Sequence, residues 1–151
     1  MKLVLTGATG FVGSKILSSI SSYDVTIIGR KKPLLFKSNN FYKADIDSST
    51  DYLPALIDAD VCIHSAARVH IMDDNSAEPL TEFRATNTAG TLNLAKQAAE
   101  AGVKRFIFIS SIKVNGECTL LNTPFRADDD MAPQDPYGIS KAEAEQGLRD
   151  I

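Results

Sequence analysis

The chain has 151 residues and a net charge of −3, and 44% of its residues are hydrophobic. This length suits one domain with a buried core, and the weakly acidic balance argues against general binding to nucleic acids or to anionic membranes. No apolar run approaches the ~20 residues that a membrane span requires. Cys62 and Cys118 lack metal-site spacing and are too few for a disulfide scaffold, which indicates reduced thiols in a cytoplasmic protein without a metal site.

Short apolar runs alternate with longer helical patterns along the chain. The predicted strands are Lys2–Thr6, 25–28, 40–44, 61–64 and 105–110. The predicted helices are 11–21, 52–57, 79–101 and 136–151, with a polar loop over 115–136. Continuous apolar strands separated by helices indicate a parallel sheet covered on both faces. Right-handed crossovers then give a doubly wound α/β fold with strand order 3-2-1-4-5.

Three glycines lie between the first strand and the first helix. Gly7, Gly10 and Gly13 have the spacing Gly-x-x-Gly-x-x-Gly, in which the first allows a tight turn, the second lets a diphosphate approach the backbone and the third allows close packing of helix on strand. The N-terminus of the helix adds free N–H groups for the diphosphate. An ordinary glycine-rich turn is the alternative, but the place of the motif at the first strand–helix junction favours dinucleotide binding.

Basic residues follow the second strand, where NAD sites place an acidic residue that binds the adenosine ribose. This chain instead has Gly29, Arg30, Lys31 and Lys32. Cationic groups there would attract a ribose 2′-phosphate, so we expect NADP(H) in preference to NAD(H). The alternative is that these side chains are solvated loop charges.

Tyr137 and Lys141 are four residues apart in the last predicted helix, so their side chains share a helix face. A nearby cation lowers the pKa of a tyrosine, and such a pair can shuttle a proton between an alcohol and a carbonyl. Taken alone, the motif is common and is more typical of a surface pair. Ser110 and Ser111 end the fifth strand, at the sheet edge where ligands bind in parallel sheets. A hydroxyl there can bind the reacting oxygen, with capping of the strand end as the alternative.

Together, these motifs resemble the extended short-chain dehydrogenase/reductase superfamily, in its NAD-dependent epimerase/dehydratase branch. The resemblance runs through the whole chain in order. Its matching pieces are Thr6-Gly7-x-x-Gly10-Phe11-x-Gly13, Asp45-Ile46, His64-Ser65-Ala66-Ala67, Asn87, Phe108-x-Ser110-Ser111, Val114-x-Gly116 and Tyr137-x-x-x-Lys141.

The resemblance implies a role for each matching position. Tyr137 would be the acid/base, Lys141 would bind the nicotinamide ribose and lower the pKa of the tyrosine, and Ser111 would hold the substrate oxygen. His64 would be structural and hydrogen-bonded to backbone. Asn87 would hold the end of the fourth strand or a bridging water. The implied cofactor contacts are Gly7, Gly10, Phe11, Val12 and Gly13 at the diphosphate, Arg30 and Lys31 at the ribose phosphate, Asp45 and Ile46 at the adenine, and Ala66, Ala67, Asn87, Ser110, Tyr137 and Lys141 toward the nicotinamide half.

Two sequence segments indicate which enzymes of the branch the chain resembles most. Ala66-Ala67-Arg68-Val69-His70 and Ser111-Ile112-Lys113-Val114-Asn115-Gly116 are similar to segments of bacterial nucleotide-sugar enzymes of surface-polysaccharide pathways. This implies hydride transfer at C4 of a UDP-hexose, by a UDP-glucose 4-epimerase-like enzyme or a 4-keto reductase. Asn115 stands where many epimerases have a tyrosine, which with Arg30 favours an NADPH-dependent reductase, and Ile112-Lys113 does not fit the Thr-Asp-Glu of a 4,6-dehydratase.

Relatives of this branch are longer and have a C-terminal substrate domain after the Tyr/Lys helix. We therefore expect residues 1–151 to form an incomplete NAD(P)-binding Rossmann domain, truncated after that helix, with poor activity alone and with the UDP-sugar bound by the full-length form. The alternatives are a non-catalytic dinucleotide-binding fragment and a purely structural one. The family also implies a homodimer through the long helix and the Tyr/Lys helix, for which Ala95, Ala98 and Ala99 offer a small-residue face; packing of that face on the sheet is the alternative.

Overall fold

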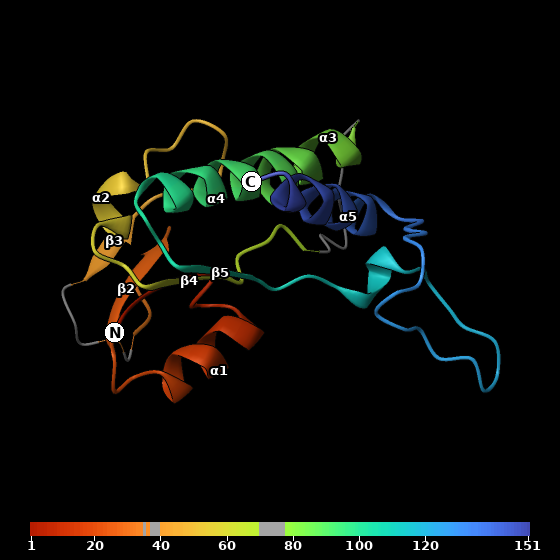
Figure 1. Cartoon of the computed structure of the whole chain (residues 1–151), viewed down its shortest axis with the longest axis horizontal. Coiled ribbons are helices and arrows are strands. Elements are labelled where there is room, and N and C mark those ends of the chain that lie inside the picture. Colours follow the sequence, from red (N-terminus) through yellow and green to blue (C-terminus); the bar gives the residue numbers. More distant parts are fainter. Residues whose placement is uncertain (35, 37–39, 70–77) are drawn as a thin grey trace.

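Five parallel strands form the central sheet of the computed structural model, which describes residues 1–34, 36, 40–69 and 78–151 (Figure 1). The strands are β1 (Lys2–Thr6), β2 (Asp24–Gly29), β3 (Phe41–Lys43), β4 (Val61–His64) and β5 (Arg105–Phe108). Their order in the sheet is β3-β2-β1-β4-β5, and all four pairings are parallel. The predicted doubly wound fold and its strand order are therefore confirmed.

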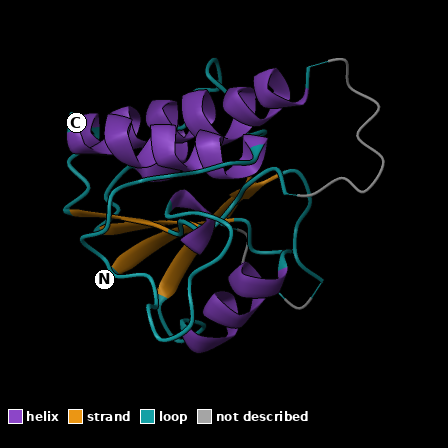
Figure 2. Cartoon of the chain, turned by 90° about the vertical axis from the view of Figure 1, so that its right-hand side faces the viewer, coloured by secondary structure: helices purple, strands orange, loops and turns teal. Residues whose placement is uncertain are grey.

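Helices cover both faces of the sheet (Figure 2). The helix α1 (Phe11–Ser19) lies on one face, and the other face carries α2 (Leu53–Leu56), α4 (Thr91–Glu100) and α5 (Pro136–Arg149). A short helix, α3 (Pro79–Phe83), precedes α4. Among the described residues, no helix is both long enough and apolar enough to cross a membrane.

The alternating side chains of the strands supply a core to each face. Leu3 and Leu5 of β1 pack with residues of α1, whereas Val4 between them packs with Leu94 of α4. Because both faces are covered, the strand is apolar at every position from Leu3 to Leu5, which explains why its sequence shows no alternation of polar and apolar residues. Because all strands are parallel, their carboxyl ends lie along one edge of the sheet.

The long helix predicted over 79–101 contains an irregular segment. Its helical path runs through α3, a π-helix, η1 (Arg84–Gly90), and α4. Two residues of η1 are closely packed. The side chain of Asn87 is buried, and a Cβ added to Gly90 would lie 2.8 Å from Ile46. Single π-helical turns inside α-helices are frequent at functional sites, and local sequence propensity carries no signal for them.

The fifth strand is shorter than predicted. It ends at Phe108, and a 3₁₀ turn, η2 (Ile112–Val114), follows Ser111. The chain then runs without helix or strand to Asp135, which caps α5 by accepting a hydrogen bond from Gly138 N at 2.6 Å. Ser110 and Ser111 therefore lie beyond the sheet edge rather than within the strand.

The alanines of α4 pack mainly inside the single chain. Ala95 and Ala98 are buried against the sheet, whereas Ala99 is exposed. This is the intramolecular packing that was the alternative to a dimer face, so these alanines give no support to an interface. The homodimer itself stays a prediction.

Candidate active site

The turn between β1 and α1 leaves no room for side chains at two of its glycines. Gly7 has a φ of +72°, and a Cβ there would lie 2.5 Å from the backbone N of Ala66. A Cβ on Gly13 would lie 2.1 Å from the carbonyl oxygen of Gly7. The turn is closed by a hydrogen bond from Gly10 N to that same oxygen at 2.9 Å. The geometry gives the close approach that a dinucleotide-binding turn requires.

The first turn of α1 opens at this glycine turn without a side-chain cap. Gly10 is the N-cap residue and has an extended backbone. As a glycine, it has no side-chain oxygen that could accept hydrogen bonds from the first N–H groups of α1. Phe11, 96% exposed, and Val12, also exposed, flank these groups. The uncapped N-terminus of α1 therefore fits the diphosphate of a dinucleotide.

The ends of β2 and β3 bring two predicted cofactor contacts together. Arg30 Nε lies 4.0 Å from Asp45 Oδ1, with both side chains largely exposed, so the ion pair is weak and both groups remain accessible. Lys31 is exposed beside them. Ile46, in contrast, packs against the core below α4 and touches Gly90. The residues assigned to the adenosine half thus share one edge of the sheet.

His64 at the end of β4 is fully buried. Its Nδ1 lies 2.7 Å from Thr6 Oγ1 and its Nε2 lies 2.8 Å from Thr91 Oγ1. Burial, together with the charge of Lys141, lowers the pKa of His64 to about 3. The imidazole is thus neutral because it is buried, and it is hydrogen-bonded to two hydroxyl groups rather than to the backbone groups that we expected from the sequence.

Asn87 ties the segment after β4 to α5. Its Oδ1 accepts from Arg68 N at 2.8 Å, and its Nδ2 donates to Arg68 O and to Ser140 Oγ, each at 3.0 Å. Half-buried Ala66 and Ala67 lie just before Arg68. The side chain of Asn87 therefore fixes the path of the chain at the position predicted for the nicotinamide half. The histidine of the same sequence phrase, His70, lies outside the described residues.

Ser111 and Tyr137 meet at the carboxyl edge of the sheet. The hydroxyl of Ser111 accepts from Lys113 N at 3.3 Å and is hydrogen-bonded to the phenol of Tyr137. Burial raises the pKa of Tyr137 above its usual value, and the hydrogen bond with Ser111 opposes that rise only in part. The lowering of the tyrosine pKa expected from Lys141 is not found, because the ammonium of Lys141 faces another partner.

That partner is an aromatic ring. Lys141 Nζ lies 3.7 Å from the ring centroid of Phe108, and the lysine is buried with only 1% of its surface exposed. The Phe108 ring also stacks on His64, with centroids 5.8 Å apart. Burial lowers the pKa of Lys141 to about 8, although Glu145 acts in the opposite direction. A buried cation with a depressed pKa, beside a tyrosine and a serine, is typical of catalytic sites.

We expect Lys141→Met to stabilise the fold at pH 7. The folded pKa of about 8 lies below the ordinary 10.5, so the unfolded chain binds more protons between these values and the charged lysine costs stability below pH 8. Removing the charge should raise the free energy of unfolding by about 3 kcal/mol at pH 7, and the gain should vanish above pH 10.5. Urea unfolding followed by circular dichroism at both pH values measures it.

Lys96→Met is the matched control for that experiment, because Lys96 is exposed on α4. It should leave the free energy of unfolding within ~0.5 kcal/mol of the wild-type value. A Lys141→Met variant that is less stable than the wild type at pH 7 would contradict the burial cost. The effect would then belong to the contact with Phe108 and not to the desolvated charge.

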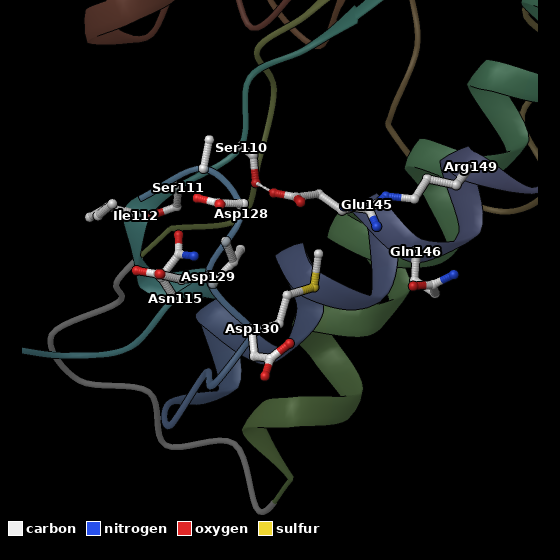
Figure 3. Close-up of a pocket in the computed structure, with 13 residues that line it drawn as sticks. Ser110, Ser111, Ile112, Asn115, Asp128, Asp129, Asp130, Glu145, Gln146 and Arg149 are labelled. Atoms are coloured by element: carbon white, nitrogen blue, oxygen red, sulfur yellow. Dashed lines mark hydrogen bonds between the residues drawn. The ribbon is translucent and has the colours of Figure 1, made fainter. Parts of the chain in front are cut away.

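Ser110 and Ser111 both line a cavity of about 710 Å³ (Figure 3). The hydroxyl of Ser110 donates to Glu145 of α5. The cavity is rich in acidic groups, since the polar segment 128–130 lines its other side. The cofactor contact assigned to Ser110 stays a prediction, and its hydroxyl is already bound within the chain.

No sequence signal pointed to several contacts in the site. Phe108 belongs to a segment that matches the family, but its contact with Lys141 was not predicted, and Glu145 is one of many charges on a helix. Lys113 pairs with Asp135 at 2.5 Å across 22 residues of chain. Such partners become visible only after the fold has brought distant segments together. Among the described residues, no group of three or more His, Cys, Asp or Glu side chains is placed to hold a metal ion.

Known proteins match the chain over nearly its whole length. It is 51% identical over 149 residues to a UDP-glucose 4-epimerase of Vibrio cholerae, a match that covers 97% of this chain and 45% of that protein. The crystal structure of UDP-glucose 4-epimerase with UDP-glucose from Thermotoga maritima is 26% identical and superposes with a TM-score of 0.84, over 99% of this chain and 50% of that one.

A third match has a cofactor in its description. The Bordetella bronchiseptica enzyme WbmG in complex with NAD and UDP is 26% identical, with a TM-score of 0.79, over 97% of this chain and 48% of that one. The chain thus spans about half the length of the relatives it matches. The profile of the NAD dependent epimerase/dehydratase family matches residues 3–151. The chain therefore belongs to the NAD dependent epimerase/dehydratase family.

Proposed function

We propose that this chain is the cofactor-binding and catalytic part of an NAD(P)-dependent nucleotide-sugar epimerase or 4-reductase, which acts at C4 of a UDP-hexose in a surface-polysaccharide pathway. The observation that carries the proposal is the contact of Ser111 with Tyr137 at the sheet edge that also bears the glycine turn, with Lys141 buried one helix turn after Tyr137. The relatives named above, with UDP-glucose and with NAD and UDP, support the substrate class. Residues 1–151 supply the reacting side chains, with little substrate specificity of their own.

The residues present fit a dinucleotide, which would accept and donate hydride when bound. Gly7, Gly10 and Gly13 hold its diphosphate, and Ala66 and Ala67 leave room for its nicotinamide half. Ser111 orients the C4 oxygen of the sugar by a hydrogen bond. Tyr137 moves the proton at that oxygen: it gives a proton once to a keto sugar in a reductase, whereas in an epimerase it first takes the hydroxyl proton and then returns it.

The burial of Tyr137 favours its role as a proton donor. Its raised pKa keeps the phenol protonated at neutral pH, which is the form that a keto sugar needs. Removal of the proton from the C4 hydroxyl requires the phenolate, which the hydrogen bond with Ser111 and the charge of Lys113 favour. Proton donation to a keto sugar is therefore the direction that the burial of Tyr137 favours.

Turnover assays test the reaction. An epimerase should interconvert C4 epimers without added cofactor, whereas a reductase should consume NADPH in proportion to the keto sugar reduced. Tyr137→Phe should lower either activity by roughly 10²–10⁴-fold. Binding of a dinucleotide without turnover of any nucleotide sugar would favour a non-catalytic dinucleotide-binding protein, and no binding at all would rule out both functions.

Arg30 supports NADP(H) as the preferred cofactor, although the Bordetella bronchiseptica relative is described with NAD. Arg30→Ala should weaken NADP binding by roughly 10–100-fold, the worth of one charge-assisted hydrogen bond, and should leave NAD binding nearly unchanged. Isothermal titration of both cofactors measures the ratio. Lys32→Ala is the matched control, because that lysine lies over the Phe36 ring and not toward Asp45. Tighter NAD than NADP binding in the wild type would contradict the preference.

A further inference from the structure

We propose that Lys113 is a positioning residue, whose ion pair with Asp135 locks the turn that carries Ser111 onto the helix turn that carries Tyr137. The inference rests on the proposed function in one respect, that these two hydroxyls are the reacting groups. Its geometric support comes from the contacts of Lys113 and Asp135 with their neighbours. Lys113 and Asp135 lie two residues from Ser111 and from Tyr137 respectively.

Lys113 sits in the 3₁₀ turn η2 directly after Ser111. Its backbone N donates to the hydroxyl of Ser111 at 3.3 Å, and its Nζ donates to Asp135 Oδ2 at 2.5 Å. The same ammonium bonds Glu117 at 3.0 Å. The Lys113 and Asp135 side chains are 28% and 25% exposed, so this pair is more sheltered from water than a surface salt bridge.

Asp135 uses its two carboxylate oxygens for two different elements. Oδ1 accepts from Gly138 N at 2.6 Å and caps α5, while Oδ2 takes the ammonium of Lys113. The backbones behind these side chains touch, because a Cβ on Gly138 would lie 2.8 Å from Lys113 O. One carboxylate therefore starts the helix of Tyr137 and holds the turn of Ser111 against it.

The same two charges act on the phenol of Tyr137. Asp135 raises the pKa of Tyr137 and Lys113 lowers it, while the hydroxyl of Ser111 lowers it through a hydrogen bond. From α3, the uncharged ring of Phe83 meets the phenol edge-on, with centroids 6.2 Å apart. From α5 itself, Lys141 directs its ammonium to Phe108. Loss of Lys113 would thus remove a cation and loosen the Ser111 contact, and both changes raise the pKa of Tyr137.

NMR of the whole chain labelled with ¹³C-tyrosine tests the proposal without cofactor or substrate, with Tyr137→Phe assigning the signal. Lys113→Met should raise the pKa of Tyr137 and abolish the nuclear Overhauser contact between Ser111 and the Tyr137 ring. Asp135→Asn keeps an oxygen for Gly138 but breaks the ion pair, so it should also abolish that contact. Lys113→Arg should restore it.

Glu117→Gln is the matched control, because it removes the other carboxylate bound to Lys113 and leaves the Asp135 pair intact. It should preserve both the contact and the pKa of Tyr137. Survival of the contact in Lys113→Met or in Asp135→Asn, or its loss in Glu117→Gln, would overturn the proposal. If Lys113→Met does not fold, Asp135→Asn alone decides. Failure of dinucleotide binding would count against the proposed function and leave these readouts unaffected.

Discussion

Acidification from about pH 6.5 to pH 4 should remove about 3 kcal/mol of folding stability through the buried imidazole of His64. In the folded chain, this ring lies between the hydroxyls of Thr6 and Thr91, with no exposed surface. Burial and the nearby charge of Lys141 lower its pKa from 6.5 to about 3. Between those values, the unfolded chain holds a proton on this residue and the folded chain does not. Stability is therefore complete above pH 6.5 and falls as the pH drops.

The slope of the free energy of unfolding against pH identifies the residue that titrates. One histidine in this window contributes up to about 1.4 kcal/mol per pH unit to the free energy of unfolding. The carboxyl groups of Asp47 and Asp60, whose pKa values hydrogen bonds lower below the ordinary 3.8, add to the loss of stability only near pH 4, at the acid end of this window. Urea unfolding by circular dichroism at pH 7, 6, 5 and 4 gives the slope.

Two substitutions separate His64 from the rest of the chain. His64→Gln should be less stable than the wild type at pH 7, because it loses a fitted buried hydrogen-bond pair, yet its stability should hardly change down to pH 4.5. His70→Gln removes the second of the two histidines and should keep the wild-type slope. An unchanged slope in His64→Gln would show that the acid sensitivity arises from other groups.

The sheet could be predicted because its signals are local. Apolar runs such as Leu3 to Leu5 mark strands that are covered on both faces, and right-handed crossovers order them. The glycine spacing at Gly7 and Gly13 was equally informative. A side chain at either position would collide with backbone of the same turn or of the segment after β4. The cap at Asp135 followed from the same local chemistry.

The predictions that went wrong depended on contacts between distant segments. The expected effect of Lys141 on the pKa of Tyr137 failed because the fold offers the ammonium the Phe108 ring, 33 residues earlier in the chain. The π-helix around Asn87 accompanies that residue's bonds to Arg68 and Ser140, which helix propensity does not include. A sequence motif thus located the candidate reacting side chains, while the charges around them became clear only from the assembled site.

The glycine turn should fail when Gly13 is replaced by alanine. The new Cβ would lie 2.1 Å from the carbonyl oxygen of Gly7 and 2.6 Å from its carbonyl carbon. These are backbone atoms, so no side chain can move aside, and α1 must shift away from β1. We expect a loss of roughly 3 kcal/mol or more in the free energy of unfolding. We also expect a loss of dinucleotide affinity on the order of 100-fold, because the N-terminus of α1 no longer meets the diphosphate.

Alanine substitutions at two other glycines serve as controls for Gly13→Ala. A Cβ on Gly10 would lie 3.3 Å from the oxygen of Gly7, so Gly10→Ala should cost less stability than Gly13→Ala. A Cβ on Gly29 meets nothing within 4 Å, so Gly29→Ala should leave stability and binding nearly unchanged. Urea unfolding and titration with NADP(H) and NAD(H) measure both properties. Equal effects at all three positions would show that the loss of chain flexibility, rather than the close packing of α1 on β1, controls binding, and would remove the main structural support for a dinucleotide site at this turn.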